Sequence, residues 1–274
     1  MQQLTRNVWA EHGFRGCNCG FLVTREGVVM IDCPQRPTDA RQWRQTILTH
    51  GQPRYLVNTE PHADHVMCDS LVPEATVIAH QGTRQAMTKH TVEAFRQRIT
   101  EIDPESLPLL EGYHVRLPTI TFESRLTLYL GDHRIELINL PGHTPWETAV
   151  YLPQERVLFT TDNVFYRVHT FLHEAVPEQW LVSLEAMKRL EADWFVPGHG
   201  QPFTDKAYLD EQAELVCRWI ATIKEAVAKG WSRDETFERL PLLDPYNPES
   251  GGPERAREIR RNSVNRLYSL YSKG

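Results

Sequence analysis

The chain has 274 residues, of which 41% are hydrophobic and 24% charged, a composition typical of a soluble globular protein with a large core. Its formal net charge of −6 provides no basic footprint for nucleic acid and weakly disfavours an extended polyanion as substrate. Five cysteines, an odd number, argue against a disulfide framework and favour a reducing compartment.

The N-terminus carries no apolar segment of the kind found in signal peptides. No apolar run approaches the ~20 residues that a membrane-spanning helix needs. We therefore expect a cytoplasmic protein whose partner is a small-molecule substrate, with no nucleic acid and no membrane among its partners.

The first part of the chain predicts alternating strands and helices. Short apolar, β-branched runs at 21–24, 27–32 and 55–58 predict buried strands. A helix is expected between the last two strands, at about 37–50, with Thr38 as its N-cap. Strand, helix and strand in this order predict a right-handed βαβ crossover.

A more polar stretch follows a further predicted strand at 76–79. Residues 82–101 predict a helix that ends before Pro104, because the residue that precedes proline avoids the α region. We expect 82–118 to form a helical insertion. The sequence leaves open whether this insertion lies over a functional site or only connects two strands.

The strand pattern returns at residue 119 and gives way to helices later in the chain. Two hairpins are expected here: 126–130 with 134–138, and 149–152 with 157–160. An amphipathic helix at 178–190 and a last strand at 194–196 follow. From about residue 206 onwards we expect helices, with loops around 241–253.

Seven side chains with metal-binding chemistry occur in turn-like contexts, each just after a predicted strand. They are Glu60, His62, Asp64, His65, His143, Asp162 and His199. Neutral imidazole and carboxylate are the ligands that borderline and hard divalent ions prefer. Seven such groups are too many for one tetrahedral ion, and they suit two adjacent ions that share a bridging carboxylate.

This pattern resembles the metallo-β-lactamase superfamily, whose motif is His-x-His-x-Asp-His followed by Gly-His, an aspartate and a final Gly-His. The resemblance spans about residues 23–200, and Asp32 matches a structural aspartate of the family. It implies an α/β fold, a four-layered αβ/βα sandwich with two mixed β-sheets and outer helices. We accordingly expect a catalytic core at 1–205 and a helical extension at 206–274 packed on it.

The resemblance also implies how the metal ions are held. Glu60, His62 and His143 would hold the first ion, Asp64, His65 and His199 the second, and Asp162 would bridge them. Zinc is the first expectation for both ions. One departure stands out, because Glu60 occupies the place of a histidine.

A carboxylate at position 60 adds one negative charge to the first metal site. The extra charge makes bound ions weaker Lewis acids, and the oxygen ligand widens the choice of metal to manganese or iron. Alternatively, Glu60 points elsewhere, for example to a basic side chain, and His62, His143 and Asp162 form a facial set of two histidines and one carboxylate.

For a hydrolase of this family, the resemblance implies that a metal-activated hydroxide cleaves a small carbonyl substrate, namely an ester, lactone, thioester or cyclic amide. Asp64 would accept or relay the proton. The main alternative is a non-haem iron redox enzyme on the same fold, similar to sulfur dioxygenases, which Glu60 makes more credible. Phosphodiester cleavage is the least favoured, since the chain is acidic and has no basic stripe.

Two further histidines, His169 and His173, follow Asp162 in a segment that lies near the metals in the family. The resemblance implies that either is a proton donor or a substrate contact, and packing or surface roles are the alternative. Arg167 either pairs with a substrate carboxylate or is solvated. Apolar residues at helical spacing within 213–228 either pack on the core or form a homodimer contact.

Overall fold

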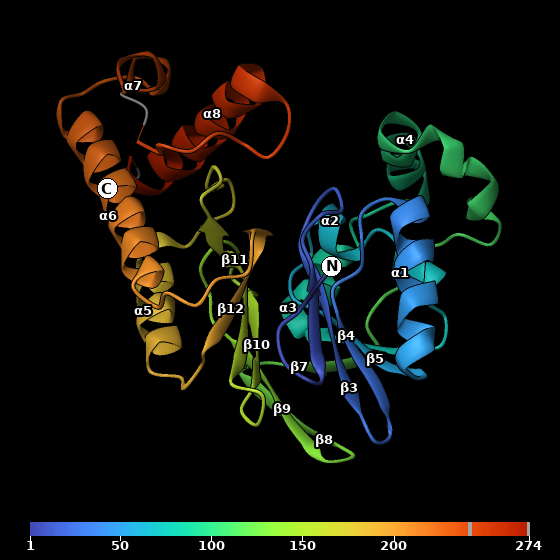
Figure 1. Ribbon diagram of the computed structural model, residues 1–274. Coiled ribbons are helices and arrows are strands. Elements are labelled where there is room, and N and C mark those ends of the chain that lie inside the picture. The colour runs from blue at the N-terminus through green and yellow to red at the C-terminus, as the bar shows by residue number, and fades with distance from the viewer. Residues whose placement is uncertain (241–242, 273–274) are drawn as a thin grey trace.

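The computed structural model describes residues 1–240 and 243–272 of the chain. Two β-sheets lie face to face, and helices cover the outer face of each sheet (Figure 1). The resulting four layers are the αβ/βα sandwich that the sequence resemblance implied. The start of the loop expected around 241–253 lies outside the described residues.

The first sheet has seven strands, which follow one another in space as they do in the chain. They are β1 (Gln2–Gln3), β2 (Val8–Glu11), β3 (Cys19–Thr24), β4 (Gly27–Ile31), β5 (Pro53–Asn58), β6 (Thr76–His80) and β7 (Ile120–Phe122). Strands β1 to β4 pair antiparallel, and β4 to β7 pair parallel. The sheet is therefore mixed, as expected.

The second sheet has five strands in the order β12-β11-β10-β9-β8. They are β8 (Arg125–Leu130), β9 (His133–Asn139), β10 (Thr148–Leu152), β11 (Val157–Tyr166) and β12 (Trp194–Gly200). All neighbours are antiparallel except β11 and β12. Both predicted hairpins are confirmed, and the first turns through Gly131, whose φ of 57° is in the left-handed region that glycine adopts freely.

Strand β4 shows why the strands of the first sheet have continuous apolar sequences. Its side chains alternate between the two faces: Val29 and Ile31 belong to the core between the sheets, and Val28 and Met30 to the core under helix α1 (Pro37–His50). Because both faces are covered, neither needs polar side chains.

The N-terminus of α1 differs from the prediction. The N-cap residue is Arg36, not Thr38, and no side chain caps the helix from that position. Instead, the Thr38 N–H and hydroxyl donate to the carboxylate of Asp103, at 3.0 and 2.9 Å. A carboxylate from a distant segment thus satisfies a free amide and faces the positive end of the helix dipole.

The single helix predicted at 82–101 is two helices, α3 (Gln81–Met87) and α4 (Val92–Ile102). Thr91 separates them because its hydroxyl accepts the N–H of Ala94 at 3.1 Å and caps α4. The end of α4 before Asp103 and Pro104 is confirmed. A 3₁₀ helix, η2 (Pro104–Leu110), follows, and the segment lies beside α1 on the outer side of the first sheet (Figure 1).

The remaining helices cover the second sheet and its neighbourhood. They are α5 (Pro177–Lys188), α6 (Tyr208–Ala228), α7 (Arg233–Arg239) and α8 (Gly252–Tyr271), besides two short helices near the site, α2 (Ala63–Val66) and η1 (Asp69–Leu71). Trp180 of α5, Trp219 of α6 and Val264 of α8 share one buried core with this sheet. The apolar stripe within 213–228 therefore packs on the core, and a homodimer contact stays a prediction.

All five cysteines are free, as their odd number indicated. Among the described residues, the helices are too short or too polar to traverse a lipid bilayer.

Candidate metal centre

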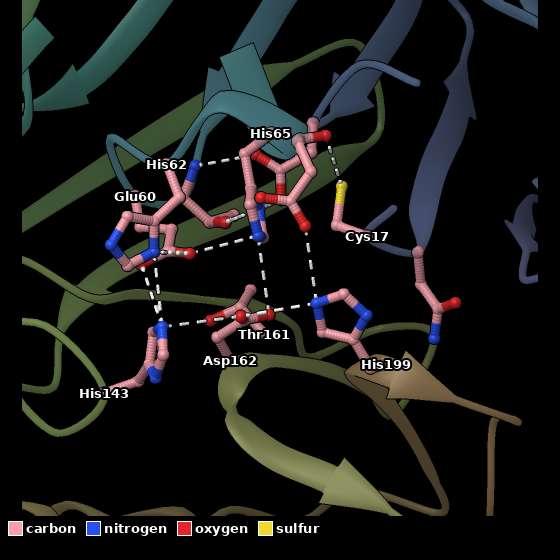
Figure 2. A network of polar contacts seen from close by, with 12 residues as sticks. Cys17, Glu60, His62, His65, His143, Thr161, Asp162 and His199 are labelled. Atoms are coloured by element: carbon pink, nitrogen blue, oxygen red, sulfur yellow. Dashed lines mark hydrogen bonds and ion pairs between the residues drawn. The ribbon is translucent and has the colours of Figure 1, made fainter. Parts of the chain in front are cut away.

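The side chains predicted as metal ligands meet in one cluster (Figure 2). Glu60, His62, Asp64 and His65 follow the end of β5, and His143 lies between β9 and β10. Strands β11 and β12 supply Asp162 and His199. Both sheets therefore contribute, and side chains from distant parts of the sequence become neighbours.

His65 and Asp162 occupy the middle of the cluster. The Nε2 atom of His65 lies 3.1 Å from Glu60 Oε1 and 3.4 Å from Asp162 Oδ1. The other oxygen of Asp162 lies 3.7 Å from His143 Nε2 and 3.5 Å from His199 Nε2. Asp162 thus faces ligands from both expected sets, which is the position that a bridging carboxylate needs.

His62 and Asp64 complete the cluster at its two ends. His62 Nδ1 lies 2.8 Å from Glu60 Oε1 and 3.2 Å from His143 Nε2. Asp64 Oδ2 lies 3.5 Å from His199 Nε2. The backbone carbonyl of Asp64 accepts the thiol of Cys17 at 3.2 Å, which holds the loop at this end (Figure 2).

We expected Asp162 to follow a strand, but it lies inside β11. The backbone reaches a φ of 53° at Thr161, and the pairing of β11 with β12 shifts register around this residue. The buried carboxylate of Glu147 accepts the Asp162 N–H at 3.1 Å and the Thr161 hydroxyl. This irregularity redirects the Asp162 side chain into the cluster without ending the strand.

His199 also lies inside its strand, β12. Steric crowding explains why a glycine precedes His143 and His199. A Cβ on Gly198 would lie 1.7 Å from Asp162 Oδ1, and a Cβ on Gly142 would lie 1.9 Å from Asn163 Oδ1. Both distances are impossible for a real side chain. The backbone at Gly198 therefore passes directly against Asp162 of the cluster, and the backbone at Gly142 against its neighbour Asn163, whose Oδ1 accepts the His143 N–H.

Two of the histidines are oriented by acceptors behind them. His65 Nδ1 lies 2.9 Å from Asp32, and His143 Nδ1 donates to the Phe171 carbonyl at 2.8 Å. Each contact leaves the Nε2 lone pair directed at the cluster. Carboxylates and carbonyls in this position fix the ring and tautomer of a metal-ligating histidine.

His199 is oriented by a residue that the sequence did not identify. Its Nδ1 atom lies 3.3 Å from Glu249, which also accepts the Gly200 N–H at 2.8 Å. Glu249 belongs to the segment before α8, so the C-terminal extension forms part of the site. No motif marks this glutamate, which lies 50 residues beyond the last Gly-His pair in a stretch rich in proline, serine and glycine.

The charges of the cluster are mutually supporting. Burial opposes the charged form of His62, His65 and His199, but the surrounding carboxylates outweigh it and raise the pKa of each imidazole well above its ordinary value. Burial likewise opposes ionisation of Glu60 and Asp162, and the histidines hold the pKa of both carboxyls low. The site therefore favours ionised carboxylates, and their negative charge favours the binding of a cation.

Three buried atoms in the cluster have no hydrogen-bond partner among the described residues: Glu60 Oε2, His65 Nε2 and Asp162 Oδ1. His62 Nε2 lies 3.6 Å from Glu174 Oε2, on the other side of its ring from the cluster. Leaving such atoms unpaired in the interior costs free energy, so their gathering calls for a common partner. Imidazole and carboxylate together suit zinc, manganese or iron. The residues present therefore fit the divalent ions that the motif implies.

The two other histidines predicted as functional lie beside the cluster in different ways. His173 stacks on His62 with ring centroids 4.8 Å apart, and burial together with His143 and His62 lowers its pKa to about 4. His169 is buried, with Nδ1 3.0 Å from the Tyr246 carbonyl and Nε2 unpartnered among the described residues. Both line the cavity above the cluster.

Arg167 contacts the ring of Tyr166 and does not line that cavity. The cavity has a volume of about 630 Å³, which suits a small molecule. Three arginines line it instead: Arg15, Arg98 of α4 and Arg255 of α8. Arg15 forms no ion pair with the described residues, and partial burial and the other arginines lower its pKa. Helix α4 thus contributes a cation to the cavity wall.

The comparisons with known proteins agree with the geometry. A model of the metallo-beta-lactamase superfamily matches residues 12–199. The linear primary-alkylsulfatase of Pseudomonas sp. is 29% identical over 170 residues, which cover 56% of this chain and 31% of the relative. The hydroxyacylglutathione hydrolase of Mesorhizobium japonicum is 29% identical over 181 residues, or 65% of this chain and 60% of the relative. The chain therefore spans less than two thirds of either relative.

Solved structures show the same fold. A metallo-beta-lactamase family protein from Thermus thermophilus superposes with a TM-score of 0.70 over 99% of this chain and 95% of its own, at 17% identity. The sec-alkylsulfatase Pisa1 from Pseudomonas sp. gives a TM-score of 0.70 over 98% of this chain and 49% of its own, at 16% identity. With a family model that covers more than half of its length, this protein belongs to the metallo-beta-lactamase superfamily.

Proposed function

We propose that the protein is a metal-dependent hydrolase that cleaves a small carbonyl substrate, namely an ester, lactone, thioester or cyclic amide. The observation that carries this proposal is the convergence of four histidines and three carboxylates around unpartnered buried atoms, beside a cavity of about 630 Å³. The hydrolase names of the relatives, hydroxyacylglutathione hydrolase among them, support the same reaction class.

Divalent ions held by this cluster would lower the pKa of water toward ~7 and polarise the carbonyl group of the substrate. Asp64 lines the cavity, and its Oδ2 atom lies 3.5 Å from His199 Nε2. Its ionised carboxylate can therefore accept the proton of the attacking water. The Nδ1–H of His169 donates to the Tyr246 carbonyl, and its Nε2 atom is unpartnered among the described residues, so this imidazole can take up a proton at Nε2 and pass it on to the leaving group.

The charged side chains of the cavity wall indicate one feature of the substrate. Arg15, Arg98 and Arg255 place positive charge around the cavity. Arg98 pairs with Glu101 at 3.2 Å and Arg255 with Glu258 at 2.6 Å, whereas Arg15 has no ion pair among the described residues. An anionic group on the substrate, away from the bond that is cleaved, would complement these charges. We therefore propose that the preferred substrates carry a carboxylate or a group of similar charge.

The test uses the whole protein, stripped of metal with a chelator and reconstituted anaerobically with zinc, manganese or iron. Chelation is expected to lower the hydrolysis of chromogenic esters, lactones and thioesters at least about 100-fold, and zinc is expected to restore it. Esters with a distal carboxylate should react with a lower KM than neutral esters that release the same alcohol. Hydrolysis that survives complete metal removal would contradict the proposal, and iron-dependent oxygen consumption without hydrolysis would favour the redox alternative.

A further inference from the structure

The position of Glu60 leaves the first metal site short of one imidazole. Glu60 Oε1 lies between the two expected sets, 2.8 Å from His62 Nδ1 and 3.1 Å from His65 Nε2. Its second oxygen is 3.9 Å from His143 Nε2. Together with His65 and Asp162 it forms a compact buried group of ligand atoms. The carboxylate thus reaches toward the second site.

A third histidine, His173, lies beside His62 and His143, the two histidines of the first site. One ring nitrogen from each of His62, His143 and His173 can be chosen so that all three lie within 4.8 Å of one another. The His173 ring centroid is 4.8 Å from that of His62 and 5.3 Å from that of His143. Tetrahedral zinc with Zn–N bonds of about 2.1 Å needs nitrogens about 3.4 Å apart, so the rings would have to move closer and His173 to turn out of its stack on His62.

The ring of His173 is positioned by packing on His62 and His143 and not by hydrogen bonds, while its flanking backbone is fixed. Among the described residues, neither ring nitrogen of His173 forms a hydrogen bond or an ion pair. The flanking backbone is fixed on both sides: the Leu172 N–H donates to Ser263 of α8 at 3.3 Å, and Arg266 of α8 donates to the Ala175 carbonyl at 3.0 Å. The Phe171 carbonyl also accepts His143 Nδ1 at 2.8 Å, which ties this segment to the first site.

We propose that His173 is a ligand of the first metal ion, in a three-histidine set with His62 and His143, while Glu60 extends between the two ions. This inference rests on the metal centre of the proposed function. It assigns His173 a ligand role in place of the expected proton transfer, which leaves that role to His169. It also explains how the chain tolerates a glutamate at position 60, since the lost imidazole is supplied from a segment 113 residues further along.

The experiment measures metal binding and not activity. Metal-free wild type, His173→Gln and His169→Gln are titrated with Co²⁺, and the bound ions and their visible absorption are recorded. His114→Gln is the matched control, because His114 is exposed and its one side-chain hydrogen bond among the described residues is to the Gly112 carbonyl. Wild type, His169→Gln and His114→Gln are expected to bind two ions. His173→Gln should bind one of them at least about 100-fold more weakly.

A second variant tests coordination through a new absorption band and not through a loss of metal binding. In His173→Cys, a thiolate in place of the imidazole would add a sulfur-to-cobalt charge-transfer band in the near ultraviolet, whereas a merely structural role for His173 would add none. Thermal unfolding of each metal-free variant checks that the fold is retained.

Two results distinguish failure of the His173 ligand role from failure of the proposed metal-dependent function. Two ions bound to His173→Gln with wild-type affinity and spectrum, together with no thiolate band in His173→Cys, would overturn the ligand role and leave the metal centre intact. A wild-type protein that binds no Co²⁺ would overturn the proposed function as well.

Discussion

At the scale of single residues, the candidate site depends on side chains outside the cluster that orient the candidate ligands. Asp32 is the clearest case, because it is buried and accepts the N–H and hydroxyl of Thr59 at 2.8 and 2.6 Å while it contacts His65 Nδ1 at 2.9 Å. Its backbone has a φ of 55°, a conformation that aspartate and asparagine adopt more readily than other non-glycine residues. One residue thus fixes both a strand end and a histidine.

Replacing Asp32 with asparagine keeps the size of the side chain and its tolerance of this backbone, and removes the charge behind His65. We expect Asp32→Asn to weaken zinc binding about 10–100-fold, because the imidazole becomes a poorer and less firmly oriented ligand. Competition with a chromogenic chelator measures the affinity. Asp132→Asn is the control, because Asp132 is exposed and its side chain contacts Arg25 and His133 and not the candidate ligands among the described residues. Equal affinities for both variants would refute the orienting role.

Among single residues, the sequence predicted the chemistry better than the exact partners. The types and spacing of Glu60, His62, Asp64 and His65 indicated a metal site, because few other arrangements bring such ligands together. Glu249 could not be found in this way. Its role arises only from tertiary packing of the C-terminal extension, and a solitary glutamate in a loop has no pattern of its own.

At the scale of elements, hydrophobic alternation and turn residues identified the strands and hairpins well. The errors concern places where a tertiary contact overrides a local rule. Asp103 replaces the predicted cap of α1, Thr91 divides a predicted helix, and Glu147 sustains the irregularity that carries β11 past Asp162. In each case a polar side chain satisfies backbone groups that the predicted pattern leaves open.

Polar contacts of Glu155 join the two sheets at the hairpin between β10 and β11. Glu155 accepts Asn7 Nδ2 at 2.7 Å, contacts His133 Nε2 at 2.9 Å and also accepts the Thr5 hydroxyl. Burial opposes ionisation of Glu155, but these partners outweigh it and lower its pKa. The loop between β1 and β2 is thereby fastened to the second sheet.

We expect Glu155→Gln to lower the free energy of unfolding by about 1–2 kcal/mol at pH 7. Because the folded-state pKa is lowered, the contribution of the carboxylate is present above its unfolded pKa of about 4.3 and is lost as pH falls through the folded value. Chemical denaturation from pH 7 down to pH 3 should therefore show the variant and wild type converging. Glu191→Gln is the control, since its side chain is 83% exposed and should change stability by less than about 0.5 kcal/mol. A constant difference at every pH would contradict this account.

At the scale of the whole molecule, the candidate site lies where three parts of the chain meet. The first sheet supplies Glu60, His62, Asp64 and His65, and the second supplies His143, Asp162 and His199. The C-terminal extension supplies Glu249 and the wall near His169. The family resemblance predicted the two-sheet arrangement, whereas the contribution of the extension lies beyond the matched residues 12–199.

The most direct test of this account is anomalous X-ray scattering from crystals of the whole protein grown with zinc. We predict two peaks about 3.5–4 Å apart, enclosed by the seven side chains, with Asp162 between them. His173 should contact the ion nearer to His62 and His143. Zinc bound only at other places, with the cluster free of metal, would contradict the central claim that distant segments of this chain jointly hold a pair of cations.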